Sequence, residues 1–119
     1  MRIKNLCAVI LFALTLQAAE FAGVWNASYV TEEGQTREST LTLVVDGNNV
    51  TGTIVSPRGH AKIEGGEIRG NKISFFVIRK SNYDEVKINF AGVLKGDQLT
   101  LKMQFGARAA VSLVATRKG

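Results

Sequence analysis

The sequence has one cysteine, Cys7, one proline, Pro57, and one histidine, His60, among 119 residues. A single cysteine forms no intramolecular disulfide, and Cys7 lies inside an apolar run rather than at the cleavage site that a lipoprotein signal requires. A histidine-based metal site would need several carboxylates around His60, and no spacing gathers them there. We therefore predict no metal site and no cofactor.

Catalytic arrangements are also missing from the sequence. The acidic pairs Glu32-Glu33 and Asp84-Glu85 consist of neighbours, which point to opposite faces of a strand and so do not form a catalytic dyad. No serine lies in a nucleophile elbow, and His60 is the only imidazole available as a base. We interpret His60 as a solvated loop residue and expect no enzymatic activity.

Long runs of one charge are absent as well. The chain has 15 basic and 10 acidic residues, but its nearest approach to a basic run is the pair Arg79-Lys80. Nucleic-acid-binding surfaces usually show clustered lysines and arginines with aromatic residues between them. We therefore expect no nucleic-acid partner.

Residues 1–19 are typical of a secretory signal peptide. Arg2 and Lys4 precede an apolar run over residues 6–16 that is too short for a comfortable membrane span, and small residues follow it. Cleavage after Ala18 or Ala19 predicts an exported, periplasmic or extracellular protein with no membrane span, whereas an uncleaved N-terminal anchor is the alternative. Loss of residues 1–19 leaves one domain, residues 20–119, and lowers the net charge from +5 to +3 because Arg2 and Lys4 leave with them.

What the sequence has in abundance is alternation of apolar and polar residues with the period of a β-strand. The only irregular stretch contains Ile63 and Ile68, five residues apart around Gly65-Gly66, where a glycine bulge supplies the required register shift. Short, evenly spaced strands predict an antiparallel sandwich or an up-and-down barrel. The remaining alternating runs span residues 25–29, 41–45, 50–54, 73–77, 86–94, 99–105 and 111–117.

The connections favour the barrel. Three are tight and rich in Gly, Asn and Asp, whereas the others are looser, and the two kinds alternate along the chain. In a meander of about eight strands, all tight turns then lie at one end and all looser loops at the other. If the first and last strands pair, Trp25 and Arg117 meet at the tight-turn end, where with Gly23 they form a structural seal, the guanidinium lying over the indole. The tight turns span residues 46–49, 70–71 and 95–97, and the looser loops 31–35, 56–60, 79–84 and 105–108.

These residues resemble known families. Gly23-x-Trp25 in the first strand, with Arg117 in the last, is similar to the signature of the calycin barrels, which include the lipocalins and avidins, and the Val50–Thr53 hairpin also resembles that of avidins. The pattern over residues 22–117 looks like small exported bacterial domains of unknown function with a G-x-W motif, and like modules appended to secreted hydrolases. The avidin resemblance would imply biotin binding, but that site uses several tryptophans and this chain has only Trp25. Lipocalins are longer and usually disulfide-bonded, so their ligand class is not expected here.

The looser loops carry the predicted ligand-binding residues. Positive groups above an apolar interior suit a small hydrophobic ligand or an amphiphile with an anionic head. The alternative is a non-enzymatic interaction or accessory module with a filled interior, which binds a protein or glycan through its loops or outer surface. A cavity that opens toward the loops distinguishes the two hypotheses. The predicted ligand-binding residues are Arg58, His60, Arg79, Tyr83 and Arg108.

Overall fold

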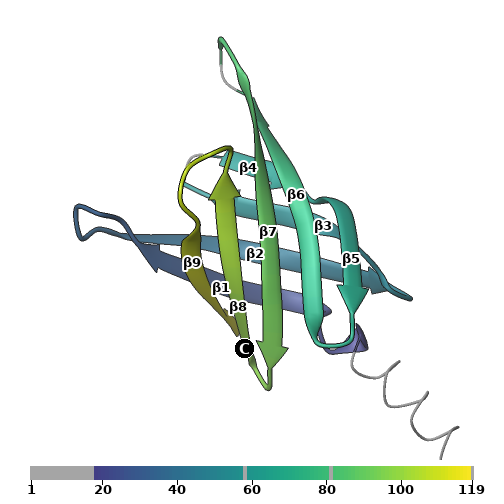
Figure 1. The fold of residues 1–119 in the computed structure, drawn as a ribbon. Helices are drawn as coiled ribbons and strands as arrows, with labels where there is room; N and C mark the ends of the chain where they lie inside the picture. Colours follow the sequence, from purple (N-terminus) through teal and green to yellow (C-terminus); the bar gives the residue numbers. More distant parts are fainter. Residues whose placement is uncertain (1–17, 58, 81, 119) are drawn as a thin grey trace, which may run out of the picture.

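The computed structural model describes residues 18–57, 59–80 and 82–118, and within them the chain forms nine antiparallel strands (Figure 1). Most of the predicted signal peptide and the predicted ligand-binding residue Arg58 lie outside the described residues. The strands are β1 (Gly23–Val30), β2 (Thr36–Asp46), β3 (Asn49–Ser56), β4 (Gly59–Lys62), β5 (Glu64–Arg69), β6 (Lys72–Lys80), β7 (Glu85–Lys95), β8 (Gln98–Phe105) and β9 (Val111–Arg117).

Eight of these strands close into a barrel. Going round it, β1 pairs with β2, β2 with β3, β3 with β5, and β5 to β9 pair in sequence until β9 pairs with β1. The predicted all-β, antiparallel meander that closes into a small barrel is therefore confirmed. Closure places Trp25 opposite Arg117 in the β1–β9 ladder.

The ninth strand arises where the sequence predicted a glycine bulge. β4 pairs with β3 over Thr53–Ser56, whereas β5 pairs with the start of β3 and with β6. The β5–β6 pairing shifts register between Glu64 and Glu67, and Gly65 lies there with a φ of 61°. The predicted bulge is therefore present inside β5, and β4, which ends at Lys62, is an additional short strand before it.

Tight turns and looser loops lie at opposite ends of the barrel. Gly47, Gly70 and Gly96 occupy the three tight turns with φ between 61° and 63°, a conformation in which a side chain is unfavourable. At the other end the β6–β7 hairpin projects well beyond the barrel (Figure 1). Two residues expected in loops lie in strands instead, because β4 begins at Gly59 and β6 continues to Lys80: His60 is on β4 and Arg79 is on β6.

The inward-facing side chains form one hydrophobic core. Phe75 and Phe90 stack inside it with their ring centroids 4.8 Å apart. No polar or charged residue is fully buried within the described part of the chain, so the core depends on apolar packing. The largest fully buried side chains are Trp25, Phe21, Leu41, Leu43, Ile63, Ile68, Leu99 and Leu101.

Candidate functional site

The tight-turn end of the barrel is closed by Trp25 and Arg117. The Trp25 side chain is completely buried, and the Arg117 guanidinium lies over its ring, 4.3 Å from the centroid. Glycine suits position 23 because its φ of 128° is a conformation that residues with a side chain rarely adopt, whereas a β-carbon there would be in ordinary contact with Arg117 Nη1 at 3.5 Å. The three residues of the predicted seal are thus in mutual proximity.

Arg117 also fastens the chain that precedes β1. Its Nη1 donates to the carbonyl of Ala22 at 3.0 Å and its Nη2 to the carbonyl of Glu20 at 2.6 Å, while its Nε faces Asp97 Oδ1 at 3.3 Å. A turn over residues 18–22 brings Phe21 into the core, and the Phe21 carbonyl accepts a hydrogen bond from Trp25 Nε1 at 3.0 Å. Among the described residues, buried side chains therefore fill this end of the barrel.

The loop end of the barrel is different, because the interior there contains a cavity of about 120 Å³. Its deep wall is apolar, and it includes Leu41, which is paired with Trp25 across β1 and β2, whereas Trp25 itself does not line the cavity. The apolar residues that line the cavity are Ala27, Leu41, Ile54, Ala61, Val77, Ile88, Phe90, Leu101, Met103, Phe105 and Leu113. The interior is thus filled at the closed end and hollow at the loop end.

Polar side chains gather only near the mouth of this cavity. Arg37 on β2, Arg79 on β6 and Tyr29 on β1 are half-buried and line it. Tyr29 and Arg37 are directly paired across β1 and β2, so their side chains share one face. The mouth is also lined by Ser39, Ser56, Pro57 and the exposed Glu38.

The predicted ligand-binding residues do not gather at one place. Arg79 lines the cavity, whereas Tyr83 is 98% exposed at the tip of the β6–β7 hairpin. Arg108 is exposed in the β8–β9 loop, where its carbonyl accepts a hydrogen bond from Gln104. His60 pairs with the exposed Val55 and lies on the outer face of β4. Of the predicted residues that the structure describes, only Arg79 reaches the cavity.

Sequence reasoning missed Arg37 and Tyr29. Alternation contained the signal, because Arg37, Ser39 and Leu41 are spaced two apart, as are Trp25, Ala27 and Tyr29. Leu41 and Trp25 are buried, so every second residue from them also faces inward. The predicted run 25–29 already contained Tyr29 without assigning it to the site, and continuing the alternation backward from Leu41 through Ser39 would have reached Arg37.

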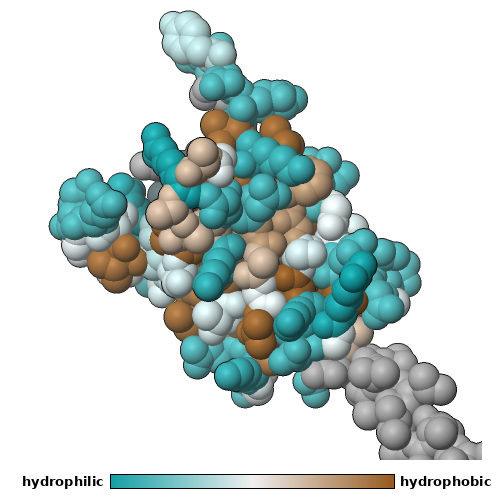
Figure 2. All heavy atoms as spheres, in the orientation of Figure 1, coloured by the Kyte–Doolittle hydropathy of each residue, from teal (hydrophilic) through white to brown (hydrophobic). Residues whose placement is uncertain are grey.

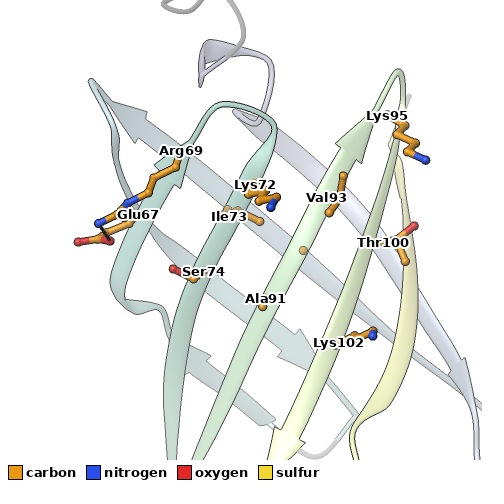
Figure 3. A pocket seen from close by; sticks show the side chains of 11 residues that line it. Glu67, Arg69, Lys72, Ile73, Ser74, Ala91, Val93, Lys95, Thr100 and Lys102 are labelled. Atoms are coloured by element: carbon orange, nitrogen blue, oxygen red, sulfur yellow. Dashed lines mark ion pairs between the residues drawn. The ribbon is translucent and has the colours of Figure 1, made fainter.

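A second and larger hollow, about 860 Å³ and open to solvent, lies on the outside of the barrel across β5 to β8. Its floor consists of small residues, including Ser74 and Ala91, and hydrophilic side chains surround paler ones on this face (Figure 2). Long basic side chains border it, and Figure 3 shows one of them, Arg69, in an ion pair with Glu67 at 3.7 Å. The other basic residues that line this outer groove are Lys72, Lys95 and Lys102.

Within 18–57, 59–80 and 82–118, no group of three or more His, Cys, Asp or Glu side chains has the arrangement of a metal site. No helix in that part of the chain is long and apolar enough to cross a membrane.

Comparison with known proteins adds no family assignment. No protein-family model, no curated protein and no solved structure matches the chain. The class of this protein is therefore described by its geometry alone: it is a small closed antiparallel barrel with one sealed end and one hollow end.

Proposed function

We propose that this protein is an exported, calycin-like binding protein that holds a small ligand inside the loop end of its barrel. The observation that carries the proposal is the interior cavity of about 120 Å³, which is apolar in its depth and polar at its mouth. Apolar walls with a few polar groups that fix orientation are typical of small-molecule sites. The sealed opposite end supports it too, because it leaves the loop end as the only way in that the described residues provide.

The cavity volume limits what the ligand can be. Sites for drug-sized ligands usually measure about 300–1,000 Å³. An apolar cavity of about 150 Å³ in another protein accepts benzene. The buried part of the ligand is therefore expected to be about the size of one six-membered ring.

Filling the cavity tests this function. Ala61 on β4 lines the cavity and is half-buried, so the variant Ala61→Phe is expected to place an aromatic ring inside it and to abolish binding of fluorobenzene. Fluorine NMR of fluorobenzene, titrated with protein, measures the binding. His60→Phe is the matched control, because it adds the same ring one residue earlier on the outer face and should leave binding intact.

Folding of these variants is checked by thermal unfolding. Ile54→Phe is a second filling variant, since Ile54 pairs with Ala61 and lines the same cavity. Wild-type protein that leaves the fluorobenzene signal unchanged, or equal binding by wild type and both folded filling variants, would contradict the proposal.

The outer groove supports a second candidate function, an accessory module that binds an acidic partner. Among the described residues, Lys72, Lys95 and Lys102 have no ion pair, so their charges are available to a partner. The groove is open to solvent, however, and exposed ion pairs contribute little binding energy. The interior cavity is therefore the better-supported site, and failure of every small probe would favour the groove.

Export forms part of the proposal and has its own test. We expect protein recovered from the cell envelope to have the mass of a chain that begins at Ala19 or Glu20. Either cut retains Phe21 and the Glu20 carbonyl that Arg117 binds, but it removes the buried Ala18, whose carbonyl accepts a hydrogen bond from Phe21 N. Intact-mass spectrometry measures the start of the chain, and a mass that still includes residues 1–19 would show that cleavage does not occur.

A further inference from the structure

The mouth of the interior cavity holds two guanidinium groups that the fold does not neutralise. Arg37 and Arg79 are half-buried, and within the described part of the chain neither has an ion pair or a hydrogen bond from its side chain. Two unpaired guanidiniums beside one apolar cavity thus mark a place for an anion.

The two arginines reach the mouth from different strands. Arg37 lies on β2, two positions before Ser39 on the inward face, and Arg79 lies on β6, two positions after the buried Val77. Strands β2 and β6 are separated by β3 and the β4–β5 stretch, so the two side chains approach the mouth from different sides. Each guanidinium offers a planar pair of donors that matches a carboxylate.

Among the described residues, one acidic residue, Glu38, lines the cavity. Glu38 lines the mouth, but it is exposed and lies between the inward-facing Arg37 and Ser39, so its side chain belongs to the outer face. Glu85 faces Lys80 at 3.7 Å on the β6–β7 hairpin. An acidic side chain that lines the cavity from an inward-facing position is not found among the described residues.

Resting on the proposed function, we propose that the ligand is a small monocarboxylic acid with a single-ring or short branched apolar body. The body occupies the cavity of about 120 Å³ and the carboxylate lies at the mouth, where Arg37 and Arg79 bind it. Leu41 lines the cavity and is paired with the fully buried Trp25 across β1 and β2, so the closed end lies directly below the cavity. A long acyl chain therefore finds no further room, and its additional carbons remain in water.

Benzoate and benzyl alcohol separate this inference from the general function, because they share a ring and differ in charge. Calorimetry on the wild type should show that benzoate binds more tightly than benzyl alcohol. Arg37→Met and Arg79→Met keep the apolar stem, and each should weaken benzoate binding about tenfold to a hundredfold, the usual effect of losing one charged hydrogen bond. Benzyl alcohol binding should change little in either variant.

Arg108→Met is the matched control, because Arg108 is exposed in a loop of the same end and does not line the cavity. It should bind benzoate as the wild type does, and thermal unfolding shows whether each variant is folded. Added salt should weaken benzoate binding and leave benzyl alcohol binding unchanged. Palmitate should bind no more tightly than hexanoate.

The possible failures are distinguishable. Equal binding of benzoate and benzyl alcohol by the wild type and both arginine variants would overturn the carboxylate inference and leave the cavity function standing. A clear gain in affinity from hexanoate to palmitate would overturn the size limit. Absence of binding by every probe would overturn both the inference and the function on which it rests.

Discussion

Trp25→Ala is expected to lower the free energy of unfolding by about 3–5 kcal/mol, the usual effect of truncating a fully buried large aromatic side chain. Trp25 is 0% exposed, and the loss would leave Phe21, whose carbonyl accepts the indole N–H, without its partner. Urea unfolding followed by circular dichroism measures the change. Tyr83→Ala is the control, because Tyr83 is 98% exposed and its removal should change stability by less than about 0.5 kcal/mol.

The same measurement tests the contact between Trp25 and Arg117. Arg117→Ala should be less destabilising than Trp25→Ala, since it removes a half-buried side chain rather than a core one. Because the guanidinium lies 4.3 Å from the indole centroid, the double variant should be less destabilised than the sum of the two single variants. A strictly additive result would show that the two residues stabilise the barrel independently.

The barrel was predictable because its strands are amphipathic and its turns are distinctive. Alternation around residues such as Leu99, Leu101 and Met103 fixes which face is buried. The positive φ of Gly47 and Gly96 explains why glycine at these points indicates a tight turn. Both signals are local, so they can be read without knowledge of the rest of the chain.

The candidate site was less predictable, because it depends on where alternation continues without apolar residues. The clear apolar pattern of β2 begins at Leu41, although the strand starts at Thr36, and Arg37 lies in the part between. Arg79 was assigned to a loop for the same reason, because β6 continues beyond its last apolar residue. The cavity volume could not be predicted from the sequence, because it is the small difference between the volume of the barrel interior and the volume of the side chains that fill it.

Gly52 has a packing role that the alternation of the sequence does not reveal. Gly52 lies inside β3, where the strand changes partner: Asn49 and Val50 pair with β5, whereas Thr53 to Ser56 pair with β4. The Gly52 carbonyl accepts a hydrogen bond from Ile63 N at 2.9 Å, at the junction of β4 and β5. Gly52 therefore lies where β3 changes its partner from β5 to β4.

Gly52→Ala is expected to destabilise the protein by about 3–5 kcal/mol, within the range of strained backbone combined with overpacking. The φ of Gly52 is 145°, and a β-carbon there would lie 1.8 Å from the carbonyl oxygen of Thr42, a backbone atom that cannot move alone. Gly47→Ala is the matched control: its φ is 63°, nothing lies within 4 Å of the added carbon, and it should cost about 1–2 kcal/mol. Urea unfolding compares the two variants. A loss for Gly52→Ala no larger than that for Gly47→Ala would mean that β2 and β3 can separate at this point, and that the pairing of β3 does not depend on the missing side chain.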